Sequence, residues 1–156
     1  MRRNDRNITE LQQIEEILAS ARILHLGMHD GEYPYVVPMH YGYRFADGRL
    51  TLYVHCAKEG HKLDCLKADD RVFAEIDCGE QLVPGEIACQ YGAMYKSIMA
   101  RGRGVILTDS QEKCEGLRLL MKTQTGEDFT FDARMADAVS VIRIDVESYT
   151  AKARVK

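Results

Sequence analysis

Apolar residues recur along the chain with two periods, and these periods predict its secondary structure. Between residues 9 and 20 they recur every three or four positions, as on one face of an amphipathic helix, at Leu11, Ile14, Ile17 and Leu18. Thr9 and Gln12 fit a capping box that starts this helix. From residue 21 to 28 the period drops to two, which is typical of a strand, with apolar side chains at Leu24, Leu26 and Met28.

The same alternation predicts five further strands. Turn signals separate the first three predicted strands of the chain from one another. The strands cover residues 33–44, 49–55, 71–77, 94–107 and 139–146. The turn signals are the Asp-Gly pairs at Asp30-Gly31 and Asp47-Gly48. Helical spacing predicts two more helices, over residues 58–68 and from Asp109 to just before Gly126. Residues 78–93 are predicted to form a loop, and residues 127–138 show no clear pattern.

The strand predicted over residues 33–44 is unusual because it contains Pro34 and Pro38. A proline has no N–H to donate to a neighbouring strand, so this strand is expected to be bulged or to lie at a sheet edge. Such a strand leaves main-chain N–H and C=O groups free to bind a ligand. Protection of an exposed edge against aggregation is the alternative reason for the two prolines.

Six strands with few helices between them predict a mainly β fold. Too few helices intervene for a parallel sheet, so we expect a small closed or half-open antiparallel barrel with peripheral helices. The chain has 156 residues, of which 46% are apolar, and this suffices for one hydrophobic core. We therefore treat residues 1–156 as a single domain.

Charge and composition limit the binding partners and the cellular compartment that the sequence predicts. Charged residues of both signs are interspersed and the formal net charge is −3, which predicts no general attraction to nucleic acid or anionic lipid. The N-terminal residues lack the apolar run of a secretory signal, and no run approaches the ~18 apolar residues of a membrane span. Five cysteines without a C-x-x-C pair indicate reduced thiols. We therefore expect a cytoplasmic protein.

Residues 52–66 carry the clearest chemical signal, because a strand ends there at His55 and a helix begins near Gly60. The first turn of a helix has unpaired N–H groups and a positive dipole end, and both attract anions. His61 adds a ring donor and Lys62 adds a positive charge. A cation in the first turn is unfavourable for the helix alone, and a bound phosphate would offset that. The pattern predicts a phosphate-binding turn.

Two other interpretations of this stretch stay open. Lys62 and His61 are equally well explained as solvated surface residues. A zinc site is the other interpretation, with His55, Cys56, His61 and Cys65 as ligands. Alternation sends His55 and Cys56 to opposite sides of their strand, so these four side chains are not expected to converge and no metal is predicted.

Three segments in order resemble one family. They are PYVVPMHYGY (34–43), HCAKEGHKLDCL (55–66) and MYKSIMARGRGVIL (94–107), and the final TAKA (150–153) resembles the family's last strand. The family comprises the nitroimidazole-resistance and pyridoxamine 5'-phosphate oxidase-related flavoproteins. The resemblance implies a homodimeric, six-stranded, Greek-key split β-barrel that binds FMN at the subunit interface.

The resemblance also implies site residues. Those placed along the flavin ring, mostly through main-chain groups, are Val37, Pro38, Met39, His40 and Tyr41. Those assigned to the phosphate are Lys58, Gly60, His61 and Lys62, with Lys96 and Ser97 as further donors. Ala57 and Tyr95 belong to the matched motifs and count as cofactor-binding. His55 matches the family's functional histidine, so it is both cofactor-binding and the candidate catalytic residue, able to protonate a substrate or hydrogen-bond an anion.

The implied function is a flavoprotein oxidoreductase that passes electrons from a nicotinamide donor through FMN to a small acceptor such as a nitroaromatic compound. The alternative is a non-catalytic flavin or haem carrier, in which His25, His40 or His55 would serve as an axial ligand. The strand count also fits a nucleic-acid-binding barrel, but the charge argues against it. No C-terminal arginine-rich substrate site is present, which argues against vitamin B6 oxidation, and Lys96 stands where many relatives have arginine.

Overall fold

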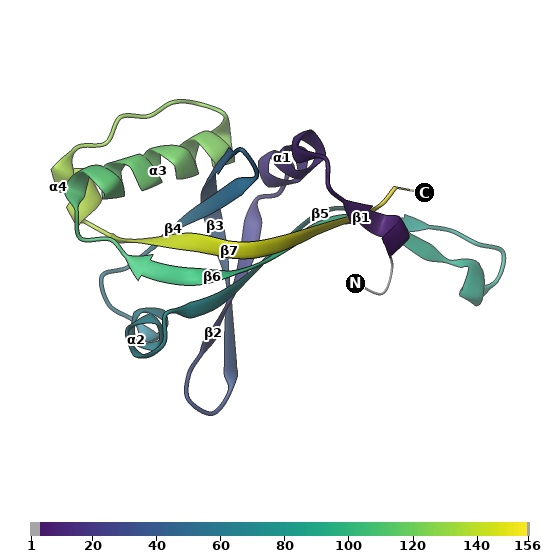
Figure 1. Cartoon of the computed structure of the whole chain (residues 1–156), viewed down its shortest axis with the longest axis horizontal. Helices are drawn as coiled ribbons and strands as arrows, with labels where there is room; N and C mark the ends of the chain where they lie inside the picture. The colour runs from purple at the N-terminus through teal and green to yellow at the C-terminus, as the bar shows by residue number, and fades with distance from the viewer. Residues whose placement is uncertain (1–3, 156) are drawn as a thin grey trace.

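The computed structural model describes residues 4–155 and contains one seven-stranded antiparallel sheet (Figure 1). Its strands are β1 (Asn7–Ile8), β2 (Ile23–His29), β3 (Pro34–Ala46), β4 (Arg49–Cys56), β5 (Arg71–Val83), β6 (Gly92–Ile106) and β7 (Ser140–Arg154). Its α-helices are α1 (Leu11–Ser20), α2 (His61–Ala68), α3 (Ser110–Thr125) and α4 (Ala133–Asp137). Two short 3₁₀ segments, η1 (Asn4–Arg6) and η2 (Ala88–Gln90), complete the described chain.

Six of the strands close into a ring. The sheet order is β1-β7-β4-β3-β2-β5-β6, and β6 also pairs with β7, so β1 alone lies outside the ring. β2, β3 and β4 follow one another through short turns, and the chain then returns through α2 to place β5 beside β2. This arrangement is a Greek key. The predicted six-stranded antiparallel barrel is confirmed, with β1 as an added short strand.

The hydrophobic core fills the barrel because alternate strand residues point inward. Leu50, Leu52 and Val54 of β4 are buried inside the barrel, while Tyr53 between them points outward and is covered by α3. The tight turn before β4 is the one predicted, since Asp47 and Gly48 both have positive φ, of 51° and 74°. Two such residues in a row form the hairpin turn that suits the right-handed twist of strands.

β3 changes its pairing partner halfway along its length. Residues 34–40 pair with β2, whereas residues 41–46 pair with β4. In the part of the chain that the structure describes, no strand pairs with the second edge of residues 34–40. Of the two predicted explanations for Pro34 and Pro38, the sheet edge is therefore correct. The bulge is not, because the register between β2 and β3 runs without a break.

α3 lies across the outside of β3 and β4. Its first turn is capped as predicted, since the Asp109 side chain accepts a hydrogen bond from the Glu112 N–H at 2.9 Å, and Gly126 ends the helix with a φ of 79°. The helix approaches β3 so closely at Gly42 that a Cβ there would overlap the main chain of Leu120. Only glycine fits at this crossing.

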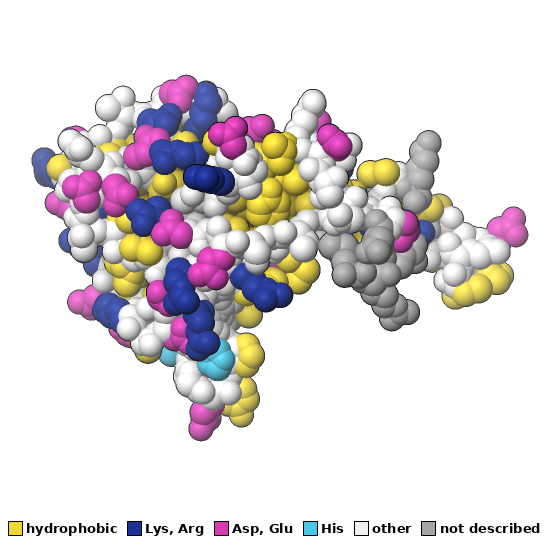
Figure 2. Space-filling model, viewed as in Figure 1, with side chains coloured by type: hydrophobic (Ala, Val, Ile, Leu, Met, Phe, Trp, Pro, Cys, Tyr) yellow, Lys and Arg dark blue, Asp and Glu magenta, His cyan; other side chains and the backbone are white. Residues whose placement is uncertain are grey.

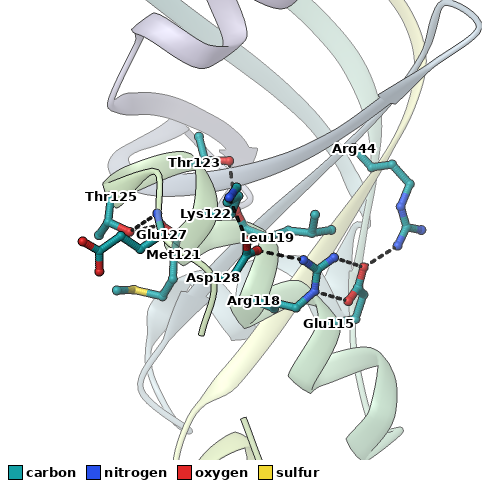
Figure 3. Close-up of polar contacts among 10 residues, drawn as sticks. All are labelled: Arg44, Glu115, Arg118, Leu119, Met121, Lys122, Thr123, Thr125, Glu127 and Asp128. Atoms are coloured by element: carbon teal, nitrogen blue, oxygen red, sulfur yellow. Dashed lines mark hydrogen bonds and ion pairs between the residues drawn. The ribbon is translucent and has the colours of Figure 1, made fainter. Parts of the chain in front are cut away.

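Ion pairs fasten α3 to the barrel and to the segment that follows it (Figure 3). Glu115 accepts from Arg44 of β3 at 2.9 Å and from Arg118 at 2.8 Å, and Asp128 bonds Lys122 at 2.8 Å. Each exposed pair contributes little alone. Together they hold the C-terminal end of α3 in place. Figure 2 shows side chains of both signs interspersed over this end of the molecule.

Several sequence predictions differ from the structure in detail. The capping box at Thr9 is wrong, because α1 begins after Glu10 without a side-chain cap. Only part of the loop predicted over residues 78–93 is a loop, since β5 continues to Val83 past a register shift between Cys78 and Gln81 and β6 already begins at Gly92. Residues 127–138 contain the short helix α4. Within residues 4–155, no helix is both long and apolar enough to span a membrane.

Candidate functional site

The turn between β4 and α2 has the features of an anion site. α2 begins after Gly60, whose φ of 143° is readily adopted only by glycine, and no side chain caps the helix. The N–H groups of His61 and Lys62 have no hydrogen-bond partner among residues 4–155, and Lys62 has no ion-pair partner there. Unpaired N–H groups, a dipole and a free lysine together favour a phosphate at this helix start.

α2 is attached to the unpaired edge of β3 through His61. Its Nε2 lies 3.3 Å from Asp30 Oδ2, and its ring stands edge-on to the Tyr35 ring with centroids 4.7 Å apart. Hydrogen bonds from the Tyr33 N–H and from His61 lower the pKa of Asp30. Asp30 engages Nε2 of His61, so this residue offers an anion its main-chain N–H and Nδ1. The open edge and the helix N-terminus therefore adjoin.

Along the open edge, the predicted ring-binding residues divide by side-chain direction. Val37, Met39 and Tyr41 point into the barrel, and Tyr41 is fully buried with its hydroxyl donating to the Leu18 carbonyl at 2.7 Å. The side chains of these three are therefore not available to a ligand at the open edge, and Tyr41 already pairs with β4. Pro38 and His40 are exposed on the outer side. This division agrees with a site built mostly from main-chain atoms.

His55 lies at the end of β4, beside the open edge and the start of α2. Desolvation by the surrounding chain, and then the positive charges of His40 and Lys62, lower the pKa of His55. Burial raises the pKa of the neighbouring Cys56 thiol, although the charge of Lys62 acts in the opposite direction. His40 and Lys62 are thus close enough to influence His55. Ala57 and Lys58 are exposed in the turn that follows.

The other predicted phosphate donors, Lys96 and Ser97 with the adjacent Tyr95, are not brought to this site within one chain. They lie near the start of β6, and α2 packs near its other end, where a Cβ on Gly104 would contact Leu66. Eight residues of strand separate Lys96 from Gly104, which corresponds to roughly 26 Å. Figure 1 shows α2 and the start of β6 at opposite ends of the sheet.

A groove of about 660 Å³ crosses the outer face of β2, β3, β5 and β6. Its apolar part includes Val36, Phe73 and Met99, whose side chains are 58%, 37% and 43% exposed. Pro34 and Val36 belong both to the groove and to the open edge of β3. The groove and the candidate site are therefore continuous.

The zinc interpretation does not match the geometry. His55 points outward and Cys56 inward, and among residues 4–155 the four side chains proposed as ligands do not form a cluster. The only group of three suitable ligand atoms in that range lies on the outer face, at His25, Glu75 and Asp77.

Sequence analysis missed two contributors to the site, Gln124 and Arg22. Gln124 donates to the Tyr41 carbonyl at 2.8 Å and to the Arg22 carbonyl at 3.1 Å. The Arg22 side chain donates to the Thr123 carbonyl at 2.8 Å. Nothing in the local sequence marks either residue, because the contacts join segments 83 to 102 residues apart.

Comparisons with known proteins agree with this geometry. Residues 10–153 match the model of the family described as pyridoxamine 5'-phosphate oxidase. A candidate 5-nitroimidazole antibiotic resistance protein from Bacteroides thetaiotaomicron is 32% identical, with a TM-score of 0.80 over 94% of this chain and 86% of that one. No protein of curated function matches the chain in sequence.

Two further solved structures share the fold at lower identity. A flavocytochrome from Azotobacter vinelandii is 19% identical, with a TM-score of 0.79 over 100% of this chain and 72% of that one. A protein from Mycobacterium smegmatis that binds FAD and haem is 14% identical, with a TM-score of 0.80 over 97% and 74%. The fold is the split barrel of a flavin-binding family. The chain belongs to the pyridoxamine 5'-phosphate oxidase family.

Proposed function

We propose that the protein is an FMN-dependent oxidoreductase whose cofactor lies along the open edge of β3, with its phosphate at the start of α2. The observation that carries this proposal is the junction of an unpaired strand edge with a free helix N-terminus. Main-chain groups of residues 34–40 would bind the polar edge of the ring, and Lys62 and the α2 N–H groups would bind the phosphate.

The active form proposed here is a homodimer with FMN at its interface. The apolar outer-face groove supplies a surface for a second copy, and it adjoins the open edge. Tyr95, Lys96 and Ser97 lie far from α2 of their own chain, so in this proposal they would complete the site of the other subunit. One chain then provides the ring edge and the phosphate turn, and its partner provides the remaining donors.

Bound FMN would supply hydride and electron transfer between a nicotinamide donor and a small acceptor. The residues of the chain would bind and orient the cofactor, and His55 would deliver a proton to the reduced acceptor. A lowered pKa makes the protonated ring a stronger acid, which suits this role. Nitroaromatic compounds such as 5-nitroimidazoles are the first acceptors to test, since the Bacteroides relative is described as a candidate resistance protein. The cytoplasmic location inferred from the sequence stays a prediction.

A flavin or haem carrier is the second candidate. Two proteins of the same fold are described as a flavocytochrome and as an FAD- and haem-binding protein, and this chain has exposed or half-buried histidines at His25, His40 and His55. A Soret band on haem titration, without turnover of a nicotinamide donor, is the outcome that would favour a carrier.

The absorbance spectrum of the purified protein, with mass identification of any released cofactor, tests the first proposal. We expect flavin absorbance or, for cofactor-free protein, an increase in melting temperature with added FMN. Oxidation of NADH or NADPH with a nitroaromatic acceptor then separates an oxidoreductase from a carrier. Protein with no flavin absorbance and no stabilisation by FMN would contradict the proposal.

A further inference from the structure

Gln124 sits in the last turn of α3 and faces two main-chain carbonyls. Its Nε2 lies 3.1 Å from the Arg22 oxygen and 2.8 Å from the Tyr41 oxygen. Exchange of the two ends of the amide would place an oxygen against both carbonyl oxygens, with no hydrogen between them. The amide orientation is therefore fixed by its surroundings, and Oε1 must face the other way.

Oε1 of Gln124 faces the ring of His40. Nδ1 of His40 lies 3.2 Å from this oxygen and 3.1 Å from the Arg22 oxygen. Both atoms only accept hydrogen bonds, so Nδ1 must carry a hydrogen. A ring flip would place a carbon against both acceptors and lose both bonds. Nε2 is consequently the free nitrogen of an exposed ring, and in the neutral ring it bears the lone pair.

His40 occupies the residue at which β3 leaves β2 and begins to pair with β4. Its ring stands at the end of the open edge and close enough to His55 to act on it electrostatically. Nε2 is therefore an exposed hydrogen-bond acceptor on a ring fixed at the end of the open edge. The side chain of His40 thus has a defined role beyond its main-chain groups.

We infer that Gln124 is a positioning residue, which holds His40 in the Nδ1–H tautomer so that Nε2 accepts a hydrogen bond from an N–H or O–H group of the ligand at the open edge. The inference about the ligand rests on the proposed function. The inference about the tautomer concerns the protein alone, and the two are tested separately.

Long-range ¹H–¹⁵N correlation spectra of the full, ligand-free chain at about pH 8 report the tautomer of each histidine ring. We expect Nδ1–H for His40. Gln124→Met removes one of the two acceptors of the Nδ1 hydrogen and leaves the Arg22 carbonyl, so it should add Nε2–H to the population and give a mixture of tautomers. Gln111→Met is the matched control, because Gln111 is exposed in the first turn of α3 and makes no side-chain hydrogen bond among the described residues. Nε2–H in the unaltered protein, or an unchanged tautomer in Gln124→Met, would overturn the inference.

FMN titration, followed by quenching of flavin fluorescence, tests the effect on the ligand. Gln124→Met is expected to weaken binding by about threefold to tenfold, and Gln111→Met should bind as the unaltered protein does. Equal affinity of Gln124→Met and the unaltered protein would overturn the role toward the ligand, even if the tautomer is held. Absence of FMN binding by the unaltered protein would overturn the proposed function and the ligand role with it, while the spectra still decide the tautomer.

Discussion

At the residue scale, the candidate site depends on a few polar groups that have no hydrogen-bond or ion-pair partner among residues 4–155. Lys62 and the N–H groups of His61 and Lys62 have no partner among the described residues, whereas the His61 ring is engaged by Asp30. Unpaired N–H groups at a helix start have a low free-energy cost only where they hydrogen-bond to water or to an anion. Residue types alone could not show that the main-chain N–H of His61 is unpaired while its ring is hydrogen-bonded to Asp30.

Replacing Lys62 tests the phosphate turn. Lys62→Ala is expected to weaken FMN binding by ~1–3 kcal/mol, because a charge-assisted hydrogen bond to phosphate is lost. Isothermal titration measures the change. Lys67→Ala is the control, since Lys67 is exposed on the same helix and its only ion pair in the described chain is with Asp64 at 3.6 Å. Equal affinities of the two variants would return Lys62 to the solvated surface.

The lowered pKa of His55 predicts how stability depends on pH. The folded pKa lies below the ordinary value of 6.5, so the unfolded chain binds this proton more readily. The free energy of unfolding should therefore fall as the pH drops through about 6.5 toward the folded pKa, and His55 should have no effect well above it. Urea unfolding between about pH 5 and pH 7.5, compared with His55→Gln, measures this part of the slope. Identical slopes of unfolding free energy against pH for the unaltered protein and for His55→Gln would show that His55 makes no contribution to this pH dependence.

At the scale of elements, the alternation of apolar residues located every strand of the ring, because each strand has one face in the barrel. The pattern underestimated the lengths of β5 and β7. The outer portions of these strands extend beyond the barrel core and carry polar residues that lack a strong period. Thr9 was predicted to cap α1, but Glu10 occupies that position instead. The end of β4 and the start of α2 were predictable because this turn is contiguous in sequence. The contribution of Gln124 was not, since it depends on where α3 crosses the barrel.

The crossing of α3 over β3 is sensitive at Gly42. Gly42→Ala is expected to lower the free energy of unfolding by about 1–3 kcal/mol, because the added methyl group overlaps the main chain of Leu120 and a helix cannot move as a side chain can. Urea denaturation measures the loss. If α3 shifts to make room, contacts of Gln124 should weaken as well. A variant as stable as the unaltered protein would show that the crossing is loose.

At the scale of the whole molecule, one chain would present only half of the proposed site. The α2 turn lies near the far end of β6, whereas residues 95–97 lie near the start of this strand. The family motifs assign all of these residues to one cofactor site. In the folded chain, residues 95–97 are far from the α2 turn. Association of two copies through the outer face would reconcile the two observations.

A charge in the outer-face groove should separate the subunits. Phe73→Glu is expected to convert a dimer into a monomer and to weaken FMN binding more than about tenfold, because an unpaired carboxylate would be buried at the interface and the shared site would be lost. Light scattering coupled to size-exclusion chromatography gives the mass. Met135→Glu is the control, because Met135 is 56% exposed on α4, outside the groove. A monomeric unaltered protein, or a Phe73→Glu dimer, would contradict the interface.

The two prolines of β3 also decide what kind of molecule the open edge accepts. An unpaired edge ordinarily recruits another polypeptide, which needs donors and acceptors in alternation along its whole length. Pro34 and Pro38 remove two donors from that series and keep their carbonyl oxygens. A foreign strand therefore meets gaps in its ladder, whereas a small planar compound needs only a few contacts and can avoid them. The missing donors thus disfavour a pairing peptide strand at this edge, whereas the proposed planar ligand would not need them.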